Sequence, residues 1–236
     1  MSSGIYVATA GAVAASQALD ATANNIANAN TAGFHGDRIT FKEALGTVKS
    51  ADVASVSAQT ARVDSQGGAL TPTENPLDLA LDGDGYFSVQ TANGTRYTRA
   101  GNFQLDDQRQ LVTGDGNPVL GEAGPIAIPP NTTSVTVGTD GSVTADGQAL
   151  GKLELTRFAT NQMKREGGSL FSATGSPAGG DPPKVRSGML ESSNVNIVRG
   201  MVDLVKESRT YESLMKIIQG YHDCEDRAAR DLGGPK

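Results

Sequence analysis

Hydrophobic positions in the first 34 residues follow the spacing of a helix. Small and apolar side chains recur in steps of three and four residues, at Ile5, Ala8, Ala12, Ala15, Leu19, Thr22 and Ile26. This heptad spacing is typical of a helix that packs along a partner helix. The only charged side chain in residues 1–34 is Asp20, so the expected helix lacks the charged face that a surface helix turns to water. We therefore predict one long helix over residues 1–34, with neighbours on several sides.

The end of the chain repeats the pattern. Steps of four and three residues connect Ile197, Met201, Leu204, Ser208, Tyr211, Met215 and Ile218. Charged side chains such as Arg199 and Lys216 lie off this stripe, so the pattern predicts an amphipathic helix over residues 194–230 that pairs with the N-terminal helix. An intramolecular hairpin of two helices is one interpretation. Assembly with further chains is favoured, because a charge-free face left in water invites association.

Between the helices, the sequence indicates short strands joined by tight turns. Residues 35–75 lack clean periodicity and are interpreted as an extended connector, with short strands such as residues 61–64. Residues 76–190 alternate strand-like runs with turn residues, and Asn93-Gly94 is a strong hairpin signal. Residues 161–186, rich in glycine and proline, are expected to be loop-like.

Together these patterns predict the α+β class. The expected fold has paired N- and C-terminal coiled-coil helices and a central antiparallel β-rich domain, with the C-terminal helix and tail in residues 191–236.

Composition narrows the class of function. In this chain of 236 residues, 37% are hydrophobic and 5% aromatic, with no tryptophan, values that are low for a compact enzyme. A net charge of −6 without a Lys/Arg cluster argues against binding to nucleic acid. The single cysteine cannot form an internal disulfide. No apolar run is long enough to predict a membrane span, and no cleavable secretory signal is indicated.

Two polar clusters are candidates for metal sites. Asp82-Gly83-Asp84-Gly85 resembles a calcium loop in its alternation, but its spacing departs from the EF-hand pattern, so a β-turn is the favoured interpretation. His222 and Cys224 are two residues apart and would point to different faces of a helix. We predict no metal, cofactor or catalytic residues. An enzyme in the β domain is retained only as an alternative, because loops can carry active sites.

Asparagines crowd the end of the first predicted helix, at Asn24, Asn25, Asn28 and Asn30. They could form a polar ligand face. The favoured interpretation is that they set the register of the paired helices and end the first one, with Gly33 as a left-handed stop.

Four blocks of the chain resemble one known family. The run from Asn24 to Phe34 is similar to the N-terminal signature of bacterial flagellar rod and hook proteins, and residues 75–87, 97–103 and 190–196 resemble further blocks of that family in the same order. The chain departs from the family pattern at Ala32, where proline is usual, and at His35-Gly36, where a basic residue is usual.

The resemblance implies a structural subunit of the flagellar basal body. Terminal helices would pair around the axis of a tubular filament, and the subunit would reach the periplasmic rod through the flagellar type III export apparatus. Copies of the chain and other rod subunits would be its partners. Residues 121–129 and 209–218 are most similar to proximal-rod members of the family, with a distal-rod or hook-type axial protein as the alternative. A surface binding module on a trimeric coiled-coil stalk is the rival from another class.

The residues expected at the assembly interface come from both ends of the chain. They are Ile5, Leu19, Asn24, Asn25, Ile26, Asn28, Asn30, Gly33, Phe34, Ile197, Met201, Leu204, Tyr211, Met215 and Ile218.

Overall fold

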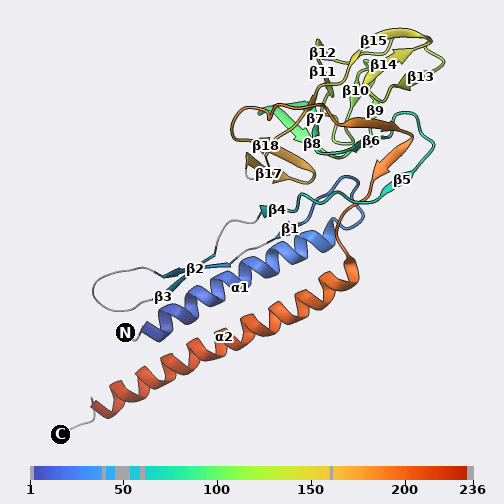
Figure 1. The fold of residues 1–236 in the computed structure, drawn as a ribbon. Coiled ribbons are helices and arrows are strands. Elements are labelled where there is room, and N and C mark those ends of the chain that lie inside the picture. Colours follow the sequence, from blue (N-terminus) through green and yellow to red (C-terminus); the bar gives the residue numbers. More distant parts are fainter. Residues whose placement is uncertain (1–2, 39–40, 46–53, 59–61, 160–161, 233–236) are drawn as a thin grey trace. The chain divides into compact units, whose positions relative to one another are not determined.

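The computed structural model describes residues 3–38, 41–45, 54–58, 62–159 and 162–232. It is an α+β protein with one helix at each end and antiparallel strands between them (Figure 1). The chain divides into two compact units. The helical unit comprises residues 1–27, 37–62 and 196–236, and the β unit comprises residues 28–36 and 63–195. Residues 39–40, 46–53 and 59–61 of the predicted connector lie outside the described residues.

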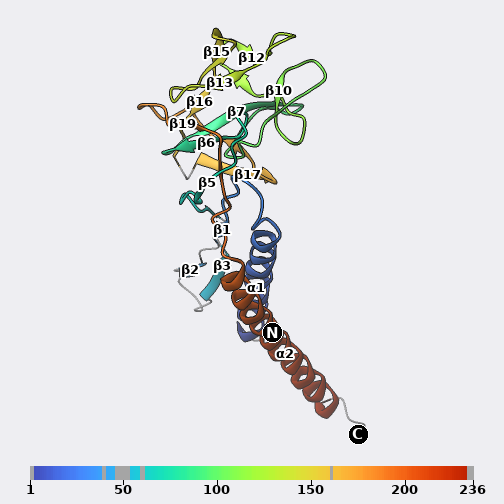
Figure 2. The ribbon, with the colours of Figure 1, turned by 90° about the vertical axis from the view of Figure 1, so that its right-hand side faces the viewer.

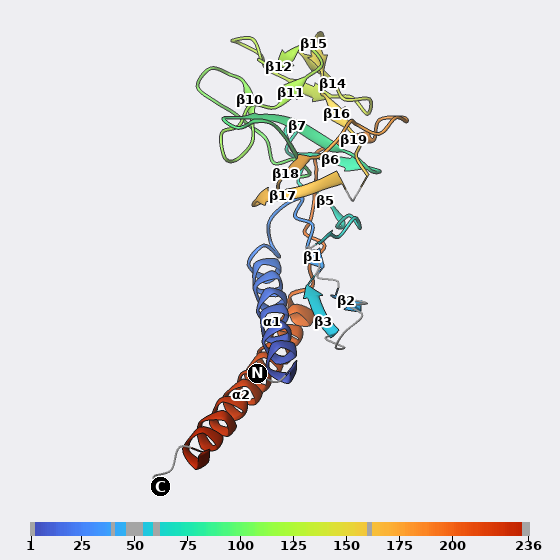
Figure 3. The ribbon, with the colours of Figure 1, turned by 90° about the vertical axis from the view of Figure 1, so that its left-hand side faces the viewer.

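Two long helices dominate the helical unit. Helix α1 (Ser3–Ala27) and helix α2 (Ile197–Leu232) lie side by side in opposite directions, and α2 continues beyond the N-terminal end of α1 (Figures 1 and 3). Close contacts at two separate points along the helices are consistent with this antiparallel arrangement. A Cβ on Gly11 would lie 3.5 Å from both Leu214 methyl carbons, and one on Gly200 would lie 2.9 Å from Cγ1 of Ile26.

A small hairpin completes this unit. Strand β2 (Phe41–Leu45) pairs antiparallel with β3 (Ala54–Ala58), from Phe41 opposite Ala58 to Leu45 opposite Ala54. Strand β3 lies along α1 (Figure 2). The predicted connector therefore contains paired strands. The connector also contains three shorter strands, β1 (Asp37–Arg38), β4 (Arg62–Val63) and β5 (Leu70–Pro72).

Helix α1 ends at Ala27, seven residues before the predicted end at Phe34. The main chain turns at once, because the Thr31 amide donates to the Asn28 carbonyl and the Thr31 hydroxyl donates to the Asn28 side chain. Asparagine side chains compete with helical hydrogen bonds in this way. Gly33 does adopt the left-handed conformation, with φ of 63°, but it does so within the β unit and does not cap the helix.

The β unit is built from short antiparallel strands. Its largest sheet has five strands in the order β16-β7-β8-β18-β17, and the remaining strands form a three-stranded sheet, β13-β14-β15, and small two-stranded ladders. Besides β5, which pairs with β20, the strands of this unit are β6 (Leu79–Asp82), β7 (Tyr86–Thr91), β8 (Gly94–Thr98), β9 (Gln104–Leu105), β10 (Leu111–Val112), β11 (Leu120–Gly121), β12 (Gly124–Pro125), β13 (Val135–Val137), β14 (Ser142–Ala145), β15 (Gln148–Lys152), β16 (Leu155–Thr156), β17 (Met163–Gly167), β18 (Leu170–Ala173), β19 (Lys184–Ser187) and β20 (Met189–Glu191).

The predicted hairpin at Asn93-Gly94 is confirmed, since β7 and β8 pair with Thr91 opposite Gly94. Phe87 of β7 is fully buried, and its ring meets Phe103 edge-on at 5.0 Å between centroids. Around them lies one aliphatic core drawn from strands along the whole unit. The segment Asp82–Gly85 connects β6 to β7, and Asp82 pairs with Arg186 at 2.9 Å.

The expectation that residues 161–186 are loop-like is wrong. Strands β17, β18 and the first residues of β19 lie there. Phe171 of β18 explains why this segment forms strands, because it is fully buried and pairs opposite Tyr97 of β8. Apolar and polar residues alternate only weakly in this segment, so its structure depends on pairing with β8, a strand that precedes it in the sequence.

Candidate assembly interface

The two long helices pack through small residues of α1. Ala8, Ala12, Ala14, Ala15 and Ala18 are all buried. Small side chains let a neighbouring backbone approach closely, so larger residues of α2 can fill the space. Half-buried positions of α2 include a series in steps of three and four, at Gly200, Leu204, Glu207, Tyr211, Leu214 and Ile218, with Asp203, Ser208 and Met215 beside it. This spacing identifies the face of α2 that meets α1.

The predicted interface residues fall into three groups. The first is half-buried in the helical unit and comprises Ile5, Leu19, Asn25, Ile26, Leu204, Tyr211, Met215 and Ile218. The second is exposed and comprises Asn24, Ile197 and Met201 on the helices, with Asn30 in the β unit. The third lies in the β unit, where Asn28 is half-buried and Gly33 and Phe34 are buried.

Asn25 makes a specific contact inside its own chain. Its side-chain amide donates to the Asp37 carbonyl at 2.9 Å, and its side-chain oxygen accepts the Asp37 amide at 2.8 Å. The Asn25 side chain thus holds the start of β1 beside α1. Both hydrogen-bonding ends of the amide are used within this subunit.

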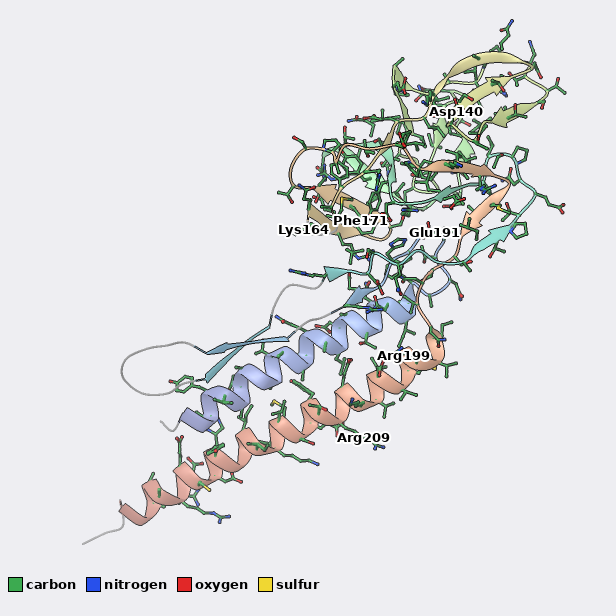
Figure 4. All side chains as sticks on the ribbon, viewed as in Figure 1. Asp140, Lys164, Phe171, Glu191, Arg199 and Arg209 are labelled. Atoms are coloured by element: carbon green, nitrogen blue, oxygen red, sulfur yellow. The ribbon has the colours of Figure 1, made fainter. Side chains whose placement is uncertain are left out.

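Helix α2 carries an exposed apolar stripe on the side turned away from α1. We define it by Val198, Met201, Val202 and Val205, which are 74%, 54%, 65% and 53% exposed. At 100° per residue, these four positions occupy one side of the helix. Figure 4 shows the basic residues Arg199 and Arg209 on the same helix. A contiguous apolar surface of this kind marks an interaction site.

A groove runs along the opposite flank of α2. Small residues of α1 form one wall, and polar residues of α2 form the other; the lining is Gly11, Ala14, Ala15, Ala18, Asp203, Lys206, Glu207 and Thr210. Its volume is about 400 Å³. One carboxylate oxygen of Glu207 is buried and has no hydrogen-bond partner among the residues that the structure describes. A buried carboxylate oxygen needs a donor, and α1 offers no charged group here.

In the β unit, a buried cluster of charges forms a second organised site. His35 Nε2 lies 2.7 Å from Oε1 of Glu191, and Arg99 Nη1 donates to Oε2 of Glu191 at 3.2 Å. All three residues are less than a tenth exposed. The Gly68 amide also donates to Oε1 of Glu191, at 3.0 Å. This cluster joins four segments that are distant in the sequence, and sequence reasoning missed it.

Burial and hydrogen bonding act in opposite directions on Glu191. Burial alone would raise the pKa of its carboxyl group, but the hydrogen bond from His35 and the charge of Arg99 outweigh burial and lower that pKa. Tyr86 is a neighbour of the cluster, with the Arg99 guanidinium 5.5 Å from its ring centroid. Burial raises the pKa of Tyr86, and the charge of Arg99 only partly offsets the rise.

Phe34 is held beside this cluster by an arginine. The Arg165 guanidinium lies 4.4 Å from the Phe34 ring centroid and 5.0 Å from that of Phe171. Arg165 also donates to the carbonyl of His35. The predicted interface residue Phe34 therefore packs in the β unit of its own chain.

The candidate metal ligands of the C-terminal helix belong to neither site. His222 and Cys224 are exposed near the end of α2. Across the described ranges, no group of three or more His, Cys, Asp or Glu side chains is placed to hold a metal ion. No described helix is both long and apolar enough to cross a membrane.

Three family models match consecutive parts of the chain. The model of the flagella basal body rod protein matches residues 5–35, and that of the D1 domain of flagellar hook protein FlgE/F/G matches residues 80–145. The C-terminal model of flagellar basal body rod FlgEFG proteins matches residues 186–231.

Curated relatives match over most or all of their length. The chain is 33% identical to the flagellar basal-body rod protein FlgF of Rhizobium meliloti, with full coverage of both chains. It is 36% identical to FlgF of Escherichia coli over 91% of this chain and 93% of that protein. It is also 36% identical to the flagellar basal-body rod protein FlgG of Bacillus subtilis, over 85% of this chain and 88% of that protein.

Proposed function

Because the chain belongs to the family of flagellar basal-body rod proteins, we propose that it is a structural subunit that builds the rod through its two terminal helices. Its likeness to the FlgF proteins of several bacteria favours the proximal rod. Its partners are other copies of the chain and other rod subunits. The flagellar export apparatus delivers it to the periplasmic rod.

The exposed apolar stripe of α2 is the observation that carries this proposal. Val198 and Val202 alone are 74% and 65% exposed. Burying an apolar side chain of this size lowers the free energy by about 1.5 kcal/mol or more relative to leaving it in water. A single chain gains none of this from the stripe, so the stripe supports a function in which a second chain covers it.

The groove between α1 and α2 fits that stripe. Its α1 wall consists of glycine and alanine, which leave room for valine side chains of a second chain. Its α2 wall offers the unpartnered Glu207 oxygen, and the stripe is flanked by Arg199 and Arg209, which can supply the donor. We therefore expect the stripe of one copy to enter the groove of the next, with an arginine paired to Glu207.

This contact joins two different surfaces of the same subunit. Stripe and groove lie on different sides of α2, so the contact is heterologous, and its repetition gives an open helical array. Such an array is what a rod requires. The same seam spacing favours coiled-coil packing of α1 with α2 inside each subunit, with Leu204, Tyr211 and Ile218 facing α1.

Two substitutions test the assignment of faces. Val202→Asp places a charge on the stripe while leaving the α1-facing side of α2 intact, so the purified chain should keep its helix content but fail to assemble or support swimming. Leu204→Asp places the charge against α1, where an unpaired buried charge costs several kcal/mol. The helix pair itself should then loosen, with the β unit still folded.

Cys224→Asp serves as the matched control. It puts the same charge on an exposed residue of α2 outside the stripe, so assembly and swimming should stay near the wild-type level. If the Val202→Asp chain restores swimming to a deletion strain as fully as the control does, the stripe is not an assembly surface. If light scattering shows an oligomer of fixed size at all concentrations, the chain is a stalked module and not a filament subunit.

A further inference from the structure

His35 lies between two hydrogen-bond acceptors in the β unit. Its Nε2 atom is 2.7 Å from the Glu191 carboxylate, and its Nδ1 atom is 3.0 Å from the main-chain carbonyl oxygen of Asp64. His35 is 1% exposed and Glu191 is 2% exposed. A carbonyl oxygen can only accept a hydrogen bond, so Nδ1 must donate to satisfy Asp64.

The Glu191 side chain is also restricted to accepting. The Arg99 guanidinium donates to one of its oxygens, and the Gly68 amide donates to the oxygen that faces His35. With a donor on each oxygen, the Glu191 carboxylate acts as a hydrogen-bond acceptor on both sides. Nε2 of His35 must therefore donate as well.

Both ring nitrogens can carry hydrogen only in the positively charged imidazolium. We propose that His35 is a proton-operated latch: the protonated ring bridges Glu191 and Asp64, and loss of the proton opens the bridge. A neutral ring donates to one acceptor and turns a lone pair toward the other. That lone pair would face an acceptor oxygen at hydrogen-bond distance, 2.7 Å at Glu191 or 3.0 Å at Asp64, and would repel it, so the latch weakens as the pH rises.

Charged groups from four segments face the latch. Glu191 of β20 attracts the imidazolium, and Asp64, after β4, turns its carboxylate to the Gln66 amide. Arg99, after β8, and Arg165 of β17 both oppose a further positive charge.

The latch closes two segments onto each other. The Gly33 amide donates to the Glu191 carbonyl at 2.7 Å, the Gly36 amide donates to the Asn194 side chain at 2.8 Å, and the Asn194 amide donates to the Phe34 carbonyl at 3.2 Å. Residues 33–36 follow α1 in the chain, and residues 191–194 precede α2. Opening of the latch should loosen all three bonds together. The latch is a property of the single chain and does not depend on the proposed assembly.

Two measurements on the full-length wild-type chain test the latch. First, ¹⁵N spectra of its histidine rings should show both His35 nitrogens protonated near pH 5. Second, hydrogen-exchange protection factors of the Gly33 and Gly36 amides should be roughly tenfold lower at about pH 8.5 than at about pH 6. Protection factors are compared so that the base catalysis of exchange cancels.

Three variants locate the effect. His35→Lys keeps a positive charge throughout this range, so its protection factors should not change with pH. His35→Gln should be weakly protected at both pH values. His222→Gln, at the exposed histidine, should behave as wild type. A His35 ring with only one protonated nitrogen near pH 5, or equal wild-type protection at both pH values, would overturn the latch. These wild-type outcomes are decisive even if His35→Gln fails to fold.

Discussion

Gly200 of α2 stands so close to Ile26 of α1 that a Cβ on the glycine would lie 2.9 Å from Cγ1 of the isoleucine. Real Cβ atoms essentially never come so near a carbon. Glycine inside a helix costs about 1 kcal/mol relative to alanine. Here that cost is offset by close contact between the last turn of α1 and the first turn of α2.

Replacing this glycine by alanine should therefore change the stability of the protein differently from the same replacement at Gly220, the other glycine in α2. A Cβ on Gly220 would have no atom of another element within 4 Å among the described residues, so Gly220→Ala should raise the stability of α2 by about 1 kcal/mol. Gly200→Ala gains the same propensity but must displace Ile26, so its net effect should be zero or negative. Thermal melting followed by circular dichroism compares them. Equal stabilisation by both would mean that α1 and α2 do not meet at Gly200.

Gly33 should be the least replaceable residue of the segment after α1. A Cβ there would lie 2.3 Å from the Ala100 amide nitrogen, and its φ of 63° is left-handed. Gly33→Ala must move main chain and should cost the β unit on the order of 3 kcal/mol. Gly116 is also left-handed but has open space around it, so Gly116→Ala should cost only about 1 kcal/mol. Urea unfolding followed by near-ultraviolet circular dichroism of the tyrosines would separate the two, and equal losses would contradict the close packing of Gly33.

The spacing of apolar residues is enough to predict both helices, and Asn93-Gly94 is enough to predict the β7–β8 hairpin. In each case, neighbours within a few residues determine the structure. The end of α1 is harder to predict, because Ala29 and Ala32 continue a helical composition. The helix is ended by polar side-chain contacts, such as that of Thr31 with Asn28. The spacing of apolar residues does not predict such contacts.

The buried charge cluster could not be predicted from local pattern. His35 and Glu191 are 156 residues apart, and each alone has the character of a surface residue. One signal is present: Arg99 and Glu191 are the only charged residues in the blocks 97–103 and 190–196. Isolated opposite charges in otherwise uncharged blocks are candidates for a buried pair, because a buried charge needs a partner.

Limited proteolysis should separate the two units. The helices of a dilute single chain bury little beyond each other, and ordering each residue costs roughly 1 to 2 kcal/mol. We expect protease to remove both helices first, leaving a resistant fragment that begins near residue 28 and ends near residue 195. Mass spectrometry of the fragments gives the boundaries. Protected helices in a monodisperse monomer would show that the helical unit is stable without partners.

Acid should destabilise the β unit through Glu191. Because the folded-state pKa of this carboxyl group is lowered from 4.5, its contribution to stability is complete above that value and is lost as the pH falls through the lowered pKa. Glu191→Gln removes the charge that Arg99 and His35 share, and should cost on the order of 3 kcal/mol near neutral pH. The difference in unfolding free energy between this variant and wild type should then shrink as the pH falls below 4.5 and through the lowered pKa, because the wild-type carboxylate takes up its proton. Glu122→Gln is the matched control, since Glu122 is exposed and its Oε1 atom lies 3.9 Å from Nζ of Lys152. The unfolding free energy of this variant should stay close to that of wild type at every pH. Urea unfolding at each pH measures both differences, and a Glu191→Gln difference that stays constant down to the lowest pH would show that the carboxylate does not stabilise the fold.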